Sequence, residues 1–248
     1  MTRWVISICL AVAGCVLVAS TAAPEADNPL RRRLSAERTE ANTVSRFERG
    51  DGNGGFVLDR SGSSILFLAD RADEVLVLDA RRSAGGGTSL VTDWGLEVLR
   101  INATGGATLY TDDAPDGVIA DFWEPARALR PRRADVDDVI ALAELTAVSL
   151  QSLLGHPVQV DYGATPREGL GVVAEAFDLS LVGINKVHAR LPGRLTRLAR
   201  VRIVSSAGPD VLFDGELLEI RIDPLAGHAG RPSSERIAQT LMGGAAPA

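Results

Sequence analysis

Three arginines near the end of a predicted helix are the residues whose type and spacing best suit a binding site. Arg190, Arg194 and Arg197 stand four and three residues apart, so they share one helix face if the break at Pro192 is mild. Such a face could hold an anionic headgroup or an anionic glycan. We favour the alternative that acids on the following strands neutralise these arginines within the fold, because exposed charges of both signs usually intermix. These acids are Asp210, Asp214, Glu216, Glu219 and Asp223.

Catalytic candidates are weak. Asp59, Ser61 and Asp93 lie at the ends of predicted strands and could serve a hydrolase that works from its loops. The chain contains no GxSxG, SxxK or Walker pattern, so a serine or nucleotide mechanism would need an arrangement that only folding assembles. The sequence therefore leaves the catalytic residues unknown.

Metal-binding signals are equally weak. The three histidines, His156, His188 and His228, lack the close spacing of metal ligands, and no HExxH motif occurs. We expect them to be solvated or to lie at helix ends. Acidic residues gather between positions 112 and 124, where they could bind calcium or supply paired carboxylates for glycoside chemistry. Acidic turns are ordinary on an exported protein, so we predict no metal site.

Two glycine patterns have the spacing of a dinucleotide-binding turn. The first, in residues 50–55, precedes a strand where the motif requires a helix, so it indicates a flexible turn. The second, at Gly169 and Gly171, follows a strand, but a capping box of Thr165 and Glu168 starts the helix upstream of it. These glycines then lie in the first turns of a helix and indicate close packing. We predict no cofactor.

The stretch from Phe56 to Trp123 has the pattern of an antiparallel β-meander, with short apolar runs between Gly, Asp and Ser turn signals. The runs are residues 56–59, 64–69, 74–79, 88–92, 96–102 and 107–111. Residues 65–68 and 75–78 are apolar throughout, so both faces of these strands must be buried. We expect the helices that follow to cover the second face. Leu66, Leu68, Leu76 and Leu78 should then be as buried as Ile65, Phe67, Val75 and Val77.

The composition changes after the meander. Residues 125–134 combine prolines with Arg127, Arg130, Arg132 and Arg133, which is typical of a linker. A helix is predicted from the N-cap Asp135 to Leu154, where Gly155 ends it. A strand over residues 158–162 and a second helix from Thr165 to about Arg190 follow.

Beyond a break at Pro192, the pattern predicts strands over residues 201–204, 211–213 and 216–222 and a final helix through about Leu241. Asp214 and Gly215 are typical of a type I′ hairpin turn. Leu218, Ile220 and Ile222 should face inward.

The fold class is therefore α+β, an N-terminal antiparallel β-meander followed by a helix-on-sheet C-terminal half. The expected organisation is a signal peptide over residues 1–22, a polar lead-in over 23–54, the meander over 55–124, a linker over 125–134 and an α+β domain over 135–243.

The N-terminus carries the strongest single signal. Arg3 gives a minimal positive region, residues 4–18 are apolar, and small residues up to Ala22 suit a signal peptidase. About 15 apolar residues fall short of the roughly 20 that a spanning helix needs, so we predict cleavage near Ala22 and a periplasmic or secreted protein. A second interpretation stays open, because residues 12–15 resemble a lipobox that would attach lipid to Cys15.

Composition narrows the class of protein. A hydrophobic fraction of 46% with 23% charged residues excludes a disordered chain. Both cysteines lie in the leader, so the mature chain is disulfide-free. Its 25 basic and 32 acidic residues give a net charge of −7, which argues against nucleic acid as the main partner.

A family resemblance rests on five segments: Phe56-Val-Leu-Asp-Arg-Ser-Gly, Glu74-Val-Leu-Val-Leu, Gly95-Leu-Glu-Val-Leu-Arg, Gly106-Ala-Thr-Leu-Tyr and Gly230-Arg-Pro-Ser-Ser-Glu-Arg-Ile-Ala. They resemble a family of uncharacterised exported alphaproteobacterial proteins known only as a domain of unknown function, over most of the mature chain. The resemblance implies export and one shared architecture. It implies no chemistry.

Two hypotheses from different classes follow. The first is an exported, non-catalytic, envelope-associated binding or structural protein, whose partner is an unknown protein or envelope component. It would associate with a membrane only through lipid on Cys15 or through the face of Arg190, Arg194 and Arg197. The second is a periplasmic hydrolase that uses Ser or acid residues from loops between the two halves. A deep cleft with convergent titratable groups would favour the second.

Overall fold

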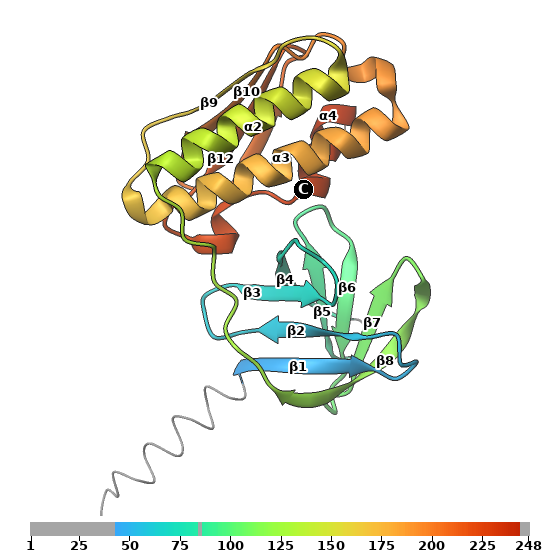
Figure 1. Ribbon diagram of the computed structural model, residues 1–248. Helices are drawn as coiled ribbons and strands as arrows, with labels where there is room; N and C mark the ends of the chain where they lie inside the picture. Colours follow the sequence, from blue (N-terminus) through green and yellow to red (C-terminus); the bar gives the residue numbers. More distant parts are fainter. Residues whose placement is uncertain (1–42, 84–85, 244–248) are drawn as a thin grey trace, which may run out of the picture.

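The computed structural model describes residues 43–83 and 86–243. Within these ranges the chain forms a closed barrel of eight strands, followed by a half in which helices pack on a four-stranded sheet. Figure 1 shows the barrel below the helical half, with the linker running along one side between them. The predicted signal peptide, the lipobox at Cys15 and most of the predicted lead-in lie outside the described residues.

The barrel strands each pair antiparallel with the next one along the chain, and β1 pairs with β8 to close the barrel. The strands are β1 (Val44–Arg49), β2 (Gly55–Asp59), β3 (Ile65–Ala69), β4 (Leu76–Arg82), β5 (Thr88–Thr92), β6 (Glu97–Ile101), β7 (Ala107–Thr111) and β8 (Ala114–Pro125). The predicted antiparallel meander is confirmed. The sequence interpretation was wrong about its two ends, because β1 lies in the predicted lead-in and β8 in the predicted acidic loop.

The barrel has its own apolar interior. The rings of Phe47 and Phe56 stack with centroids 5.1 Å apart, and Phe56 lies 4.9 Å from Phe67, which links β1, β2 and β3. Leu58, Leu90 and Leu99 are almost completely buried beside them. Closure therefore buries the inward face of every strand without a covering helix.

The expectation that helices cover the second face of the meander is wrong. Of the eight apolar side chains predicted to be equally buried, Phe67, Val75 and Leu78 are buried and the other five are half-buried, so neither set is exposed. The reason for the burial of these side chains differs from the one expected. Ile65 and Phe67 pair across the strands with Leu78 and Leu76 and face the barrel interior, whereas the helices pack on a sheet of their own.

The C-terminal half is a two-layer arrangement. Its helices are α2 (Val136–Leu154), α3 (Leu170–Arg190) and α4 (Ser234–Met242), with short 3₁₀ turns η1 (Arg167–Gly169), η2 (Pro192–Leu195) and η3 (Gly227–Gly230). Its strands are β9 (Gln159–Tyr162), β10 (Arg200–Ser205), β11 (Asp210–Phe213) and β12 (Leu217–Ile222), in the order β11-β12-β10-β9. Strands β9, β10 and β12 run parallel, and β11 is antiparallel at one edge.

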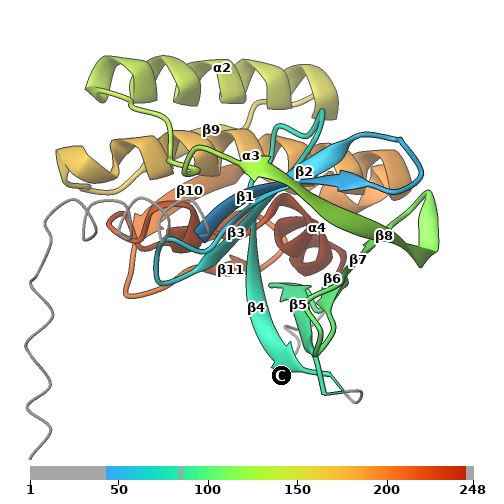
Figure 2. The ribbon, with the colours of Figure 1, turned by 90° about the horizontal axis from the view of Figure 1, so that it is seen from below.

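The helices lie side by side, with α3 between α2 and α4 (Figure 2). Leu218, Ile220 and Ile222 point from β12 into the core that α3 covers, which confirms their predicted inward direction. The residues between them on the strand are polar and half-exposed. Among the helices that the structure describes, none combines the length and apolarity needed to cross a membrane.

Some of the helix and turn signals in the sequence agree with the structure and others do not. Asp135 caps α2 and forms a capping box with Asp138, and Gly155 ends the helix with a left-handed conformation. The capping box predicted at Thr165 is wrong, because its hydroxyl donates instead to the carbonyl of Gly163 and a 3₁₀ turn precedes α3.

The turn before β12 is not of type I′ either. Gly215 has a positive φ but Asp214 does not. The carboxylate of Asp214 accepts hydrogen bonds from the backbone N–H groups of Glu216 and Leu217, which holds the chain in an Asx turn.

Candidate functional site

Among the described residues, the closest polar contacts between the two halves surround the start of α4. Asp93, in the turn between β5 and β6, accepts hydrogen bonds from the backbone N and the Oγ of Ser233 at 2.9 and 2.6 Å. Glu74, just before β4, accepts from the backbone N and the Oγ of Ser234 at 2.9 and 2.5 Å. Two barrel carboxylates thus lie at the positive end of the α4 dipole. Asp93, a catalytic candidate from the sequence, therefore joins the two halves.

A second group of contacts extends this junction. The Nη2 of Arg231 donates to the carbonyl of Val75 in the barrel at 3.1 Å, and its Nε donates to Glu175 of α3 at 2.6 Å. The Nδ1 of His228 lies 2.9 Å from the same carboxylate oxygen. Burial opposes ionisation of Glu175, but the hydrogen bond from His228 and the charge of Arg231 outweigh it and lower its pKa. His228 is 5% exposed, so the expectation of a solvated histidine is wrong here.

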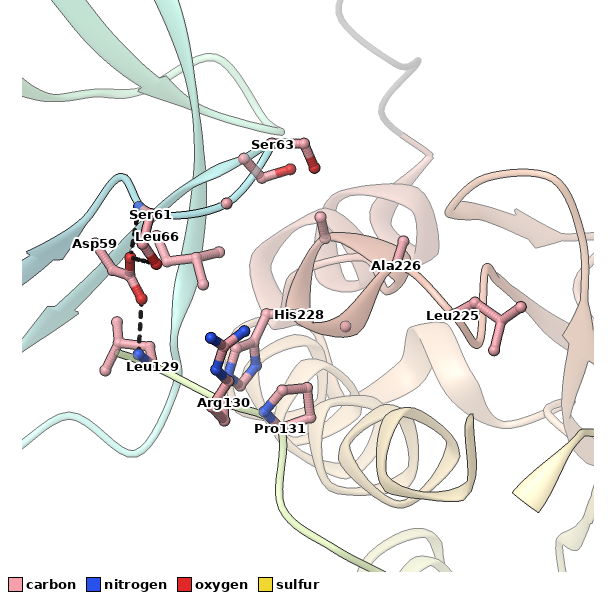
Figure 3. Close-up of a pocket in the computed structure, with 14 residues that line it drawn as sticks. Asp59, Ser61, Ser63, Leu66, Leu129, Arg130, Pro131, Leu225, Ala226 and His228 are labelled. Atoms are coloured by element: carbon pink, nitrogen blue, oxygen red, sulfur yellow. Dashed lines mark hydrogen bonds between the residues drawn. The ribbon is translucent and has the colours of Figure 1, made fainter. Parts of the chain in front are cut away.

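One cleft, which we call the first cleft, lies between the barrel, the linker and η3. Its volume is about 280 Å³, and Asp59, Ser61, Arg130 and His228 are among the residues that line it. Figure 3 shows Asp59 and Ser61 on the barrel side and Leu225 on the η3 side, with Arg130 and His228 between them. The cleft therefore brings together two of the three sequence-predicted catalytic candidates, without Asp93.

Hydrogen bonds in the first cleft explain what Asp59 does. One carboxylate oxygen accepts from the backbone N and the Oγ of Ser61 at 2.8 and 2.6 Å, and the other accepts from the backbone N of Leu129 at 2.8 Å. Burial raises the pKa of Asp59, but these hydrogen bonds outweigh it and lower the pKa. An ionised Asp59 thus fastens the linker to the barrel.

A larger groove adjoins the first cleft and shares Arg130 and Leu225 with it. We call it the arginine groove: its volume is about 690 Å³, and its walls include Arg130, Arg132, Arg133, Arg167, Glu168 and Leu225. Arg132 forms an ion pair of 3.0 Å with Asp178. Arg133 and Arg167 form no ion pair with any residue in the described ranges. The groove thus offers guanidinium groups whose charge the described chain does not neutralise by contact.

Glycines hold the floor of the arginine groove in place. A Cβ on Gly171 would lie 2.0 Å from the carbonyl oxygen of Arg132, and a Cβ on Gly169 would lie 2.3 Å from the Cβ of Pro224. The close packing predicted for these glycines is confirmed. Gly171 packs against the linker and so fixes the backbone at Arg132, whereas Gly169 packs against Pro224 in the segment after β12.

A third cleft, which we call the mouth cleft, opens at the end of the barrel that faces α3 and α4. Its volume is about 430 Å³. Its lining includes Phe67, Leu76, Trp94, Leu96, Asp112, Lys186, Arg190 and Glu235. Apolar residues come from the barrel and its turns, and most of the charged residues come from the two helices. No spacing pattern in the sequence indicates this cleft, because it forms from segments far apart in the chain.

The three arginines proposed from the sequence contact different partners. Arg190 donates to Glu235 at 3.3 Å, the Nε of Arg194 donates to the carbonyl of Leu241 at 2.9 Å, and Arg197 pairs with Glu216. Arg190 ends α3 whereas Arg194 lies in η2, so the break at Pro192 separates them. The basic linker carried the stronger signal for an anion site, in four arginines within seven positions, but its composition also fits a simple connection.

Metal ligands do not gather in the described part of the chain, where no group of three or more His, Asp or Glu side chains is placed to hold an ion.

The family match is clear. The chain belongs to the family described as Domain of unknown function (DUF4908), whose model matches residues 29–241. This match confirms the resemblance to a domain of unknown function and spans both the barrel and the helical half. No curated protein and no solved structure matches the chain.

Proposed function

We propose that this member of the family is an exported binding protein and that its arginine groove takes up an anionic ligand of the cell envelope. The observation that carries the proposal is the pair of Arg133 and Arg167, which line the groove from the linker and from η1 without an ion pair to any residue of the described ranges. The predicted signal peptide supports an envelope location.

Charge supports an anionic ligand. The chain as a whole has a net charge of −6, yet the groove is lined by four arginines and a single acid, Glu168. Guanidinium groups bind phosphate and carboxylate oxygens in a bidentate manner, and they do so most strongly where no protein carboxylate competes. The groove therefore favours a ligand with two or more negative charges.

The linker backbone that carries Arg132 and Arg133 is also held in place before a ligand arrives. Asp59 fastens the linker at Leu129, and the close approach of Gly171 fastens it at Arg132. An ordered site loses less conformational entropy on binding. The volume of about 690 Å³ lies in the range of small-molecule sites, which run from about 300 to 1,000 Å³. A short anionic oligomer fits this description.

Calorimetry with two ligands tests the proposal. Tripolyphosphate and tetragalacturonate carry the two candidate anionic groups, and we expect at least one of them to bind and to bind more weakly as salt rises. Arg133→Gln combined with Arg167→Gln should weaken binding at least tenfold. The matched control is Arg81→Gln combined with Arg82→Gln, which removes the same charge from exposed positions on β4.

Two results would refute the arginine groove as the site. The first is an equal loss in the groove variant and the control variant. The second is the absence of binding by both ligands at low salt.

A hydrolase is the second candidate function, and one observation favours it. His228 is oriented by Glu175 through Nδ1, and its Nε2 has no hydrogen-bond partner within the described chain. A carboxylate–imidazole pair of this kind can serve a serine nucleophile. The hydroxyl of Ser61, in the same cleft, donates to Asp59 rather than to an imidazole. Labelling by a fluorophosphonate that Ser61→Ala abolishes would support the hydrolase over the binding protein.

A further inference from the structure

The mouth cleft has an apolar floor. Phe67 and Leu76 belong to the barrel interior and reach its open end, while Trp94 and Leu96 stand on the turn between β5 and β6. Leu96 is 51% exposed, so this turn presents an apolar side chain to the cleft rather than to the core. A ligand with an apolar body would bury this surface, which supplies most of the driving force in such sites.

The helical side of the mouth cleft carries an excess of positive charge. Lys186 and Arg190 both pair with Glu235, at 3.2 and 3.3 Å, so two cations share one carboxylate. Lys186 also donates to Ser234 at 2.9 Å, which occupies it further. Arg190 is half-exposed and uses one of the five N–H donors of its guanidinium in this pair. Arg190 is therefore the group best placed to receive a carboxylate.

The barrel side carries an acid with no contact of its own. Asp112, in the turn between β7 and β8, is exposed and forms no hydrogen bond or ion pair with the residues that the structure describes. Glu74 lines the same side, but both of its carboxylate oxygens accept hydrogen bonds from Ser234. Asp112 is thus the acid on this side whose carboxylate has no partner in the described chain.

We infer that the mouth cleft is a binding site for a zwitterion with an apolar body, of which an apolar α-amino acid is the simplest case. The ligand carboxylate lies on Arg190, its ammonium group lies on Asp112, and its side chain packs on the floor that includes Trp94. A ligand with one charge satisfies only one of these two groups. This site is separate from the arginine groove and does not depend on it.

Calorimetry with three related ligands tests the inference. The ligands are L-leucine, N-acetyl-L-leucine, which lacks the ammonium group, and L-leucinamide, which lacks the carboxylate. We expect leucine to bind the full chain and each analogue to bind at least tenfold more weakly. In a Trp4→Phe, Trp123→Phe background, the fluorescence of Trp94 should change on addition of leucine, because it is then the sole tryptophan of the chain.

Variants assign each charge to its partner. Asp112→Asn should weaken leucine binding and remove the difference between leucine and its N-acetyl form. Arg190→Gln should do the same for leucine and leucinamide. The matched controls are Asp113→Asn, which alters the neighbouring carboxylate that pairs with Arg49 at 2.8 Å, and Arg197→Gln, which alters the arginine that pairs with Glu216.

Three outcomes would overturn the inference. One is no binding of leucine at millimolar concentration, and another is equal binding of leucine and its two analogues. The third is a loss of binding in Asp113→Asn as large as that in Asp112→Asn. Retained leucine binding in the Arg133→Gln, Arg167→Gln variant would separate this site from the arginine groove.

Discussion

Removal of the Asp93 carboxylate tests whether the barrel holds the helical half in place. Asp93→Ala deletes two hydrogen bonds, from the backbone N of Ser233 at 2.9 Å and from its Oγ at 2.6 Å. Ser233 keeps its own role as the N-cap of α4, because its Oγ still accepts from the backbone N of Arg236 at 3.0 Å. The substitution therefore removes the contact between the halves and leaves the helix cap intact.

The expected loss of stability follows from the type of hydrogen bond that Asp93→Ala removes. Hydrogen bonds to charged groups contribute about 1.5–3 kcal/mol each, and the half-buried position of Asp93 places the sum near the lower end, at roughly 3 kcal/mol. For a chain of this size each kcal/mol shifts the melting temperature by about 2–4 °C, so we expect a fall of roughly 6–12 °C. Ser233 is 5% exposed, so solvent replaces the lost acceptor poorly.

Urea denaturation followed by two signals provides the assay. Far-UV circular dichroism follows the helices, and the fluorescence of Trp94, measured in the Trp4→Phe, Trp123→Phe background, follows the barrel end. Asp79→Ala is the matched control, because Asp79 is an exposed acid on β4, and we expect it to change the free energy of unfolding by less than about 0.5 kcal/mol. If Asp93→Ala has an effect no larger than that of Asp79→Ala, Asp93 does not hold the halves together.

Two further substitutions test the packing and the buried charge. Gly171→Ala would place a Cβ 2.0 Å from the carbonyl oxygen of Arg132, so we expect a loss of about 1–3 kcal/mol in urea denaturation, whereas Gly62→Ala, with nothing within 4 Å, should be neutral or slightly stabilising. Equal effects would contradict the close approach. Glu175 has a lowered pKa in the folded state, so its contribution to stability is complete above its unfolded pKa of about 4.3 and is lost as the pH falls through the folded value. Glu175→Gln should therefore destabilise the protein at pH 7 and flatten the decline of stability below about pH 4.5, and an unchanged acid limb would refute this role.

Local signals in the sequence predicted local structure well. Asp135 and Gly155 mark the ends of α2 because a cap and a left-handed residue are properties of one short segment. Alternation on β12 identified its inward face for the same reason. Thr165 failed as a cap because a competing acceptor, the carbonyl of Gly163, lies two residues before it. The spacing rule for a capping box takes no account of such a competing acceptor.

Closure of the barrel was beyond the sequence. An open meander and a closed barrel have the same alternation, and the difference depends on whether the first and last strands meet. β1 carries the charged residues Arg46, Glu48 and Arg49 among its apolar ones, and β8 contains Gly117 with several acids, so neither resembles a strand by composition. Pairing with each other stabilises β1 and β8 as strands, although their composition does not favour strands.

The candidate sites could not be predicted from the sequence for a related reason. The arginine groove joins the linker to Arg167, and the mouth cleft joins Asp112 to Arg190, across separations of dozens of residues. Residue types at such distances produce no spacing pattern. The arginines that did show a pattern, Arg194 and Arg197, have contacts within the fold.

The same end of the barrel contributes to both the junction and the mouth cleft. Different residues of this end serve the two roles. Glu74 and Asp93 each use both carboxylate oxygens in hydrogen bonds to the start of α4, so these two acids hold the helix. Trp94 is the neighbour of Asp93 and yet lines the cleft, because successive residues of a turn point in different directions. A ligand at Trp94 would therefore lie against the turn that holds α4, which makes occupancy of the cleft and attachment of the helical half energetically dependent on each other.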